Sequence, residues 1–403
     1  MKLDIHVGTW SLGSTIQLKE YYKALANDYS LYFSKEEIIA WKKGIHLDKI
    51  SYETKAFNNI EGTLDNGMSL DIVEDGLVIL GKKGENVKED TQHVSEFLTN
   101  HIEPFLQNMR GRDVSIPKIT EEKFVPRGTV IYARRLTQKQ LEEIFVELDC
   151  PVYKKVKLEK GGMWIGETAA VLFNVSLNKD ELEETVRYLM FARLYEQELK
   201  QMLTVQRVLW NQIEGIKYQR LYKYSELPDV RDRALQIQLN TVFFRGRSRQ
   251  MNQFLSWREE YIDQYLSDHI LSQTFCGFFR SLKSTQRYLD EMWEMTSRHA
   301  DVTVEAISLL YSDTQQRELR TLQRLFLVST VVSVLSLGAL AGSKMLTYTK
   351  QGEILTQAHI SSWSVDSFVF YGLITLGVSL LFYLLFYMVF GTFRKAKRII
   401  RKK

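Results

Sequence analysis

The sequence predicts an α+β cytoplasmic domain, followed by a long helical stalk and two C-terminal transmembrane helices. Three observations in the 403 residues lead to this fold class. Turn-forming residues break short β-rich runs in the N-terminal part, no proline follows Pro228, and two long stretches near the C-terminus carry no charge. Without proline a chain can form long uninterrupted helices, and about 20 uncharged apolar residues can cross a bilayer as a helix.

The composition is that of a globular protein in a reducing compartment. Hydrophobic residues make up 45% of the chain and charged residues 25%, and the net charge is only +4. So small a net charge argues against a nucleic acid as partner, because binding to phosphates needs a concentrated basic surface. The two cysteines, Cys150 and Cys276, cannot form a disulfide framework. The N-terminus has no apolar stretch like that of a signal peptide.

Residues 1–177 are expected to form the cytoplasmic α/β domain. Hairpin signals occur at Asp65-Asn66-Gly67, Glu74-Asp75-Gly76 and Gly161-Gly162. We interpret the order of elements as two βαββα repeats, joined by the linker 110–126, because a Gly-Met pair (Gly67-Met68, Gly162-Met163) opens the corresponding strand of each copy. The expected elements are strand 2–10, helix 17–41, strands 47–60 and 68–81 and helix 88–109, then strand 129–134, helix 137–148, strands 152–159 and 163–175 and a helix from 179.

Residues 178–278 are expected to form long cytoplasmic helices. Asn178 and Glu181 have the spacing of a capping box at the start of a helix that runs to about Tyr224, and another helix is expected from Asp229 to about His269. Residues 279–345 are expected to form one stalk helix that continues into transmembrane helix 1. A helix of about 65 residues, roughly 100 Å long, needs neighbours, and copies of the same chain around a symmetry axis would supply them. The chain is therefore expected to be a homo-oligomer.

The transmembrane helices are expected at 325–343 and 367–393, two stretches without charge. A buried core helix is the alternative for each. Basic residues precede the first stretch and fill the tail 394–403, whereas the loop 346–366 contains one lysine. The positive-inside rule therefore places both termini in the cytoplasm, the loop outside and the protein in the cell inner (plasma) membrane. The basic tail either contacts anionic lipids of the bilayer or only fixes the topology.

The first stretch contains a row of four serines and one leucine. Its members are separated by four, three, four and three positions, which places them on one face of a helix: Ser329, Ser333, Ser336, Leu340 and Ser343. Hydroxyl groups in hydrocarbon need partners, so this face is expected either to line a water-filled pore or to pack closely against another helix. On the same face, the apolar residues Leu319, Leu322 and Phe326 form either a gate that closes by dewetting or ordinary packing positions.

No sequence motif predicts catalysis. There is no P-loop, no GxSxG, no HExxH and no paired cysteine ligands, and the histidines are scattered, so an enzyme is not expected and no metal ligands are identified. The cluster Arg245, Arg247 and Arg249 either contacts an anionic ligand or lipid head group or is a solvated helix face.

The order of α/β domain, long helices, stalk, first span, short outer loop, second span and basic tail resembles the CorA-type magnesium transporter superfamily. The resemblance implies a pentamer whose first span lines the pore, with a cation such as Mg²⁺ as the transported ion and no resident cofactor. The family's Gly-Met-Asn sequence at the pore mouth is absent, and Gly342, Ser343 and Lys344 stand in its place. Five copies of Lys344 around one axis would repel a divalent cation.

Two other functions fit the same layout. A CorA-like membrane effector, for example of a prokaryotic defence system, would open when its cytoplasmic domain senses a signal ligand or a partner protein. A membrane-anchored scaffold would not conduct at all. An ion channel or transporter is the first hypothesis, because the hydroxyl row and the stalk occur together.

Overall fold

The computed structural model describes residues 2–10, 17–54, 57–109, 127–158, 161–218, 222, 224–265, 272–348 and 377. Within these ranges, side chains are described except at 224, 263–265, 334, 335 and 337–348. The expected outer loop, the second transmembrane helix and the basic tail therefore lie outside the described residues, apart from a few residues. The chain divides into two compact units, 1–307 and 308–403.

Nine strands form one sheet in the order β2-β3-β4-β5-β1-β6-β9-β8-β7. The strands are β1 (Leu3–Trp10), β2 (Leu47–Glu53), β3 (Asn59–Leu64), β4 (Ser69–Val73), β5 (Leu77–Gly84), β6 (Arg127–Ala133), β7 (Val152–Lys157), β8 (Gly162–Gly166) and β9 (Ala169–Phe173). All neighbours are antiparallel except β6 and β9. The described part of the chain is thus an α+β protein with long helices, as the sequence predicts.

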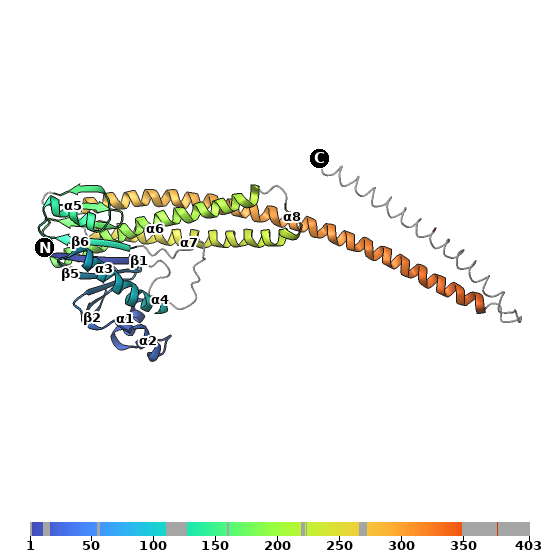
Figure 1. Cartoon of the computed structure of the whole chain (residues 1–403), viewed down its shortest axis with the longest axis horizontal. Coiled ribbons are helices and arrows are strands. Elements are labelled where there is room, and N and C mark those ends of the chain that lie inside the picture. The colour runs from blue at the N-terminus through green and yellow to red at the C-terminus, as the bar shows by residue number, and fades with distance from the viewer. Residues whose placement is uncertain are drawn as a thin grey trace. The chain divides into compact units, whose positions relative to one another are not determined.

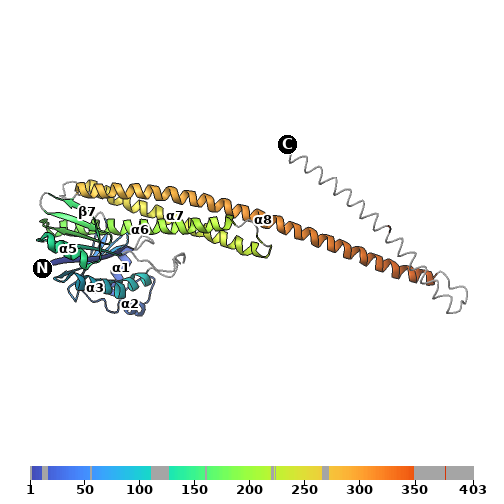
Figure 2. The ribbon, with the colours of Figure 1, turned by 45° about the horizontal axis from the view of Figure 1, so that its top comes forward.

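Helices cover both faces of the sheet (Figures 1 and 2). They are α1 (Leu18–Asn27), α2 (Lys35–Trp41), α3 (Val87–Phe97), the π-helix η1 (Leu98–Ile102), α4 (Glu103–Met109), α5 (Gln138–Glu147), α6 (Lys179–Tyr218), the 3₁₀-helix η2 (Tyr224–Glu226), α7 (Leu227–Tyr265) and α8 (Ser272–Tyr348). Apolar residues of α1–α5 pack on one face, and those of α6–α8 pack on the other. Alternation along the strands explains this arrangement: in β5, Val78 and Leu80 face the first group of helices, and Leu77 and Ile79 face the second.

Helix α6 packs directly on the centre of the sheet. Gly8 and Gly128 lie opposite each other in β1 and β6, and a Cβ atom at either position would lie only 2.7 Å from the Met190 side chain of α6. Trp10 at the end of β1 contacts Phe191 and Tyr195 of α6, with ring centroids 5.1 and 5.5 Å apart. The glycines therefore allow the helix to approach, and the aromatic rings fill the space beside it.

Several expected elements differ from the structure. The single helix expected at 17–41 is wrong, because Asp28 adopts a left-handed conformation that ends α1, and Ser34 caps a separate helix α2. The single strand expected at 68–81 is also wrong, because it consists of β4 and β5, joined by a turn in which Gly76 has a φ of 91°. The hairpin signal at Glu74-Asp75-Gly76 is thereby confirmed.

The two halves of the sheet have the same order of strands but different numbers of them. In each half the first strand lies at the centre, a helical segment leads to the outer edge, and a meander returns to the first strand. The meander has four strands in the first half and three in the second, so β5 runs antiparallel to β1 whereas β9 runs parallel to β6. The internal repeat stays a prediction.

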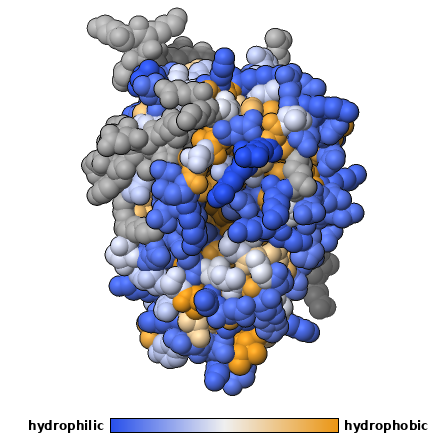
Figure 3. Space-filling model, turned by 90° about the vertical axis from the view of Figure 1, so that its left-hand side faces the viewer, coloured by the Kyte–Doolittle hydropathy of each residue, from blue (hydrophilic) through white to orange (hydrophobic). Residues whose placement is uncertain are grey.

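Among the described residues, no helix offers a segment of the length and apolarity needed to cross a bilayer. Helix α8 includes the expected stalk and begins seven residues earlier, at Ser272 instead of Phe279. Figure 3 shows one face of the molecule, whose surface is mainly hydrophilic with small separate apolar patches. Many of the large apolar side chains that are exposed lie on α7 and α8.

His6 in β1 predicts a pH dependence of stability. Its Nε2 atom is buried without a hydrogen-bond partner in the described part of the chain, and burial lowers the pKa of the imidazole from 6.5 to about 4. The unfolded chain therefore binds a proton more readily than the folded chain between these two values. The stability that the neutral ring provides is present above pH 6.5 and is lost as the pH falls towards 4, by up to about 1.4 kcal/mol per pH unit.

Denaturation midpoints of the wild type and of His6→Gln, measured from pH 7 to pH 4.5, test this expectation. The wild type should lose stability more steeply than His6→Gln, and the exposed control His93→Gln should behave like the wild type. Equal slopes for the wild type and His6→Gln would show that His6 does not stay neutral through burial.

Candidate functional site

Two of the three described hydroxyl groups of the serine row (Ser329, Ser333 and Ser336) are bonded to their own helix. Ser333 Oγ donates to the carbonyl oxygen of Ser329 at 2.9 Å, and Ser336 Oγ donates to that of Val332 at 2.8 Å. Such bonds satisfy a hydroxyl hydrogen where no water is available, and they leave the oxygen free to accept a hydrogen bond or contact a cation. The pore-lining role of Ser329, Ser333 and Ser336 stays a prediction.

The three expected gate residues belong to a larger set of exposed apolar residues on α8. Leu319, Leu322 and Phe326 are all more than half exposed on α8 in the single chain. Leu325 and Val328, which point in other directions, are exposed to a similar extent. Among the side chains of α8 that the structure describes, exposure does not distinguish the expected gate residues from the rest of the apolar surface. The gate therefore also stays a prediction.

Only the backbone of the expected pore mouth is described. Helix α8 extends to Tyr348 and so includes Leu340, Gly342, Ser343 and Lys344 in its backbone. The side chains of these residues are not among those described.

The three arginines of the cluster on α7 do not share one face. Arg247 Nε lies 3.6 Å from Glu198 Oε1 on α6, where burial raises the pKa of the Glu198 carboxyl and the arginine opposes that shift. Arg245 and Arg249 lie on the side of Glu294 on α8. Arg298 lowers the pKa of the Glu294 carboxyl most, and Arg245 and Arg249 lower it further. A contact with an anionic ligand or lipid stays a prediction for Arg245 and Arg249, while Arg247 has a partner inside the bundle.

A buried ion pair joins α7 to the sheet. Arg258 Nε donates to Asp75 Oδ2 at 2.7 Å, and Arg258 Nη2 lies 2.5 Å from the same oxygen. Arg258 is 1% exposed and Asp75 3%. The other carboxylate oxygen accepts from the Leu77 amide at 3.1 Å, and the guanidinium lies 4.3 Å from the Phe191 ring centroid. Both charges are thus almost completely removed from water, and each depends on the other.

A second arginine joins α6 to the sheet. The Arg187 guanidinium contacts three carboxylates at 2.6–2.9 Å: Asp71 in β4, Glu61 in β3 and Glu184 on α6 itself. Burial alone would lower the pKa of Arg187, but the carboxylates outweigh it and raise the pKa above its ordinary value. The arginine therefore stays charged and holds α6 against two strands.

A layer of polar side chains connects α6, α7 and α8. Tyr195 donates to Gln286 Oε1 at 2.8 Å, and Gln286 Nε2 donates to the Ser248 carbonyl and to Asp290 Oδ1, both at 3.0 Å. Burial raises the pKa of the Tyr195 hydroxyl, so it is a stable donor. Directional contacts between buried polar groups fix the register of packed helices in a way that apolar contacts do not.

The ion pairs and the polar layer make the sheet and the first part of the helical bundle one coupled body. They were not identified from the sequence. Among the described residues, no group of three or more His, Cys, Asp or Glu side chains is arranged to hold a metal ion.

Comparison with known proteins shows a distant likeness in structure and none in sequence. No family model matches the sequence, and no curated protein matches it. Among solved structures, the chain is similar to the CorA magnesium transporter from Methanocaldococcus jannaschii, with 12% sequence identity and a TM-score of 0.32. That alignment covers 65% of this chain and 93% of the transporter chain.

Proposed function

We propose that this chain is a homo-oligomeric, CorA-like membrane channel or transporter whose pore is lined by the C-terminal part of α8. One observation carries the proposal: large apolar side chains, 43–75% exposed, surround α8 from Leu325 to Val332. Successive residues turn by about 100°, so these side chains point in nearly all directions around the helix axis. A helix that is apolar all round needs a bilayer or other helices around it.

In this proposal 325–343 and 367–393 cross the inner (plasma) membrane, with both termini in the cytoplasm. The hydroxyls of Ser333 and Ser336 support a pore wall, because their hydrogens are bonded to the helix backbone and their oxygens can face water or a cation. The transported ion is a cation, and Mg²⁺ is one candidate. A ring of Lys344 at the mouth favours ions of lower positive charge over divalent ones.

Exposed apolar side chains on unit 1–307 support assembly of several copies. Tyr288, Met295 and Val302 lie seven residues apart on α8 and are 54–62% exposed. This spacing is typical of a seam between helices in a coiled coil. A second row on α7 consists of Leu235, Leu239 and Val242. A bond of 2.7 Å from Gln238 to Asp301 holds α7 and α8 together at this level.

Ion flux through the reconstituted protein tests the pore. Ser333→Leu and Ser336→Leu should each reduce flux about tenfold or more, because they replace a polar group by a larger apolar one on the pore wall. Thr330→Leu is the matched control: Thr330 makes the same bond to its helix, to the Phe326 carbonyl at 2.8 Å, but lies on another face. Equal flux in all three variants and the wild type would refute the assignment.

The signal-gated effector is the second candidate, and the buried ion pairs favour it. They couple the sheet to α6 and α7, so a ligand or partner protein that moves the sheet would move the helices with it. Purified protein would then conduct only after the signal is added. Constitutive flux would argue against the effector, and a monomer without flux would indicate the scaffold.

A further inference from the structure

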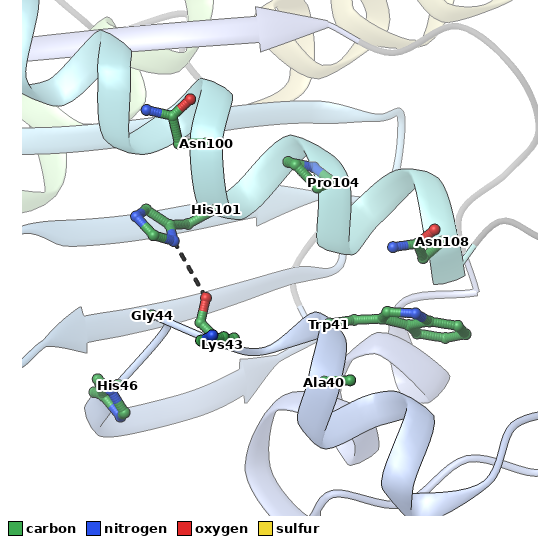
Figure 4. A pocket seen from close by; sticks show the side chains of 9 residues that line it. All are labelled: Ala40, Trp41, Lys43, Gly44, His46, Asn100, His101, Pro104 and Asn108. Carbon is green, nitrogen blue, oxygen red and sulfur yellow. Dashed lines mark hydrogen bonds between the residues drawn. The ribbon is translucent and has the colours of Figure 1, made fainter.

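A cavity of about 580 Å³ lies on the α1–α4 side of the sheet, between the end of α2 and the segment η1–α4. Figure 4 shows Asn100, His101, Pro104 and Asn108 on one side and the chain from Ala40 to His46 on the other. Its volume is in the range of small-molecule sites and far exceeds the needs of a bare ion. None of the roles proposed above uses these residues.

The lining of the cavity is basic, and its described residues include no acid. Six of its side chains can donate hydrogen bonds, and the rest have no polar side-chain atom; the nine residues are Ala40, Trp41, Lys43, Gly44, His46, Asn100, His101, Pro104 and Asn108. No carboxylate is among these nine. Donors with a positive charge and no competing acid favour an anionic group.

The ammonium group of Lys43 is available to a ligand, whereas that of its neighbour Lys42 is already bonded within the fold. Lys42 Nζ donates to Asp28 Oδ1 at 2.5 Å and to the Leu25 carbonyl at 2.7 Å, so it stabilises the end of α1. In the part of the chain that the structure describes, the Lys43 ammonium makes no ion pair and the amides of Asn100 and Asn108 make no hydrogen bond. These three donor groups are therefore not already used by the described part of the fold.

His101 is held in place by the opposite wall. Its Nδ1 lies 3.2 Å from the Lys43 carbonyl oxygen, as the dashed line in Figure 4 marks. A carbonyl only accepts, so Nδ1 carries the proton and Nε2 is left for another partner. Gly44 makes this approach possible: its φ is 88°, and a Cβ there would lie 2.4 Å from His101 Nδ1.

The π-helix places two of the donors. Asn100 and His101 belong to η1, where one extra residue per turn widens the helix. Such single π turns cost stability and occur often at functional sites. The widened turn of η1 and Gly44 opposite it thus allow the end of α2 and the segment η1–α4 to line the same cavity.

We propose that this cavity binds a small organic oxyanion, either a carboxylate or a phosphate monoester. Lys43 neutralises the anion, the amides of Asn100 and Asn108 donate to its oxygens, and Trp41 and Pro104 contact its apolar part. The site does not depend on the proposed pore, because binding is measured without ion flux.

Calorimetric titration of the full-length protein in mild detergent tests the site, with phenyl phosphate and benzoate as separate probes. At least one probe should bind the wild type with a Kd in the millimolar range or below, and the stronger of the two identifies the anionic group. Lys43→Glu and Asn108→Asp should each weaken that probe tenfold or more, because each places a negative charge at the cavity. Lys139→Glu on α5, where the lysine side chain is 88% exposed, should bind like the wild type.

Absence of binding by both probes would overturn the proposal. So would a probe that binds the wild type, Lys43→Glu and Asn108→Asp equally well. Circular dichroism of both variants shows whether they are folded, and two variants on different segments keep the test decisive if one of them is not.

Discussion

Replacing Asp75 by asparagine is expected to lower the free energy of unfolding by about 3–5 kcal/mol, because it leaves the charge of Arg258 buried without a counter-ion. Asparagine has the same shape and keeps an oxygen for the hydrogen bond from the Leu77 amide. The loss therefore reports on the charge and not on the turn between β4 and β5. Urea titration of the purified protein in mild detergent, followed by tryptophan fluorescence, measures it, and the Trp10 indole donates to the Asp75 carbonyl at 2.9 Å.

Two further variants distinguish the buried pair from an ordinary one. Adding Arg258→Met to Asp75→Asn removes both charges and should restore more than half of the lost stability, since an apolar side chain suits the aromatic surroundings. Glu259→Ala breaks the partly exposed pair with Lys283, whose atoms are 2.6 Å apart, and should cost less than about 1 kcal/mol. If Asp75→Asn costs no more than Glu259→Ala, the ion pair does not hold α7 to the sheet.

Elements with local signals could be predicted from the sequence. The start of α6 is confirmed at residue level: the Asn178 side chain accepts from the Glu181 amide and the Glu181 carboxylate accepts from the Asn178 amide, both at 2.8 Å. The hairpin turn at Asp65-Asn66-Gly67 is confirmed as well. Capping and turn formation depend on residues within four positions of each other, so the sequence shows them directly.

Long-range contacts could not be predicted in this way. Asp75 and Arg258 are 183 residues apart, and Asp75 in the sequence is only part of a turn signal. An acidic residue in a turn is common, and nothing near it indicates a buried partner. For the arginine cluster, helix geometry already excludes a single face: Arg247 is two residues from Arg245 and therefore points about 200° away. The structure confirms that separation, because Arg247 contacts Glu198.

The exposed row on α8 could likewise be identified only from the structure. Tyr288, Met295 and Val302 have the same chemistry as the residues on the opposite face of this helix, where Leu289 and Trp293 are buried. Only the packing against α6 and α7 shows which apolar residues remain at the surface. The sequence predicted that the stalk needs neighbours, from its length, but not which side would meet them.

Introducing glutamate at Met295 and Val302 together is expected to break the proposed oligomer into monomers of 47.2 kDa. Both side chains are more than half exposed in the single chain, so the change costs the protomer little. In a symmetric assembly the two glutamates recur in every copy, and each would be buried beside apolar groups or beside other glutamates. The molar mass in mild detergent, measured by light scattering during size exclusion, reports the result.

Arg287→Glu is the matched control for charge on the same helix. Arg287 is exposed, and helix geometry turns it about 80° from Met295 and about 60° from Val302, so a glutamate there lies beside the row and not within it. It should leave the oligomer intact, while Met295→Glu with Val302→Glu should give monomers whose helical content is unchanged by circular dichroism. Two copies that stay together in the double variant would show that another surface holds them, and the α7 row of Leu235, Leu239 and Val242 would then be the next to change. A monomeric wild type would remove the basis for a pore on an axis, because a single row of hydroxyls cannot enclose water.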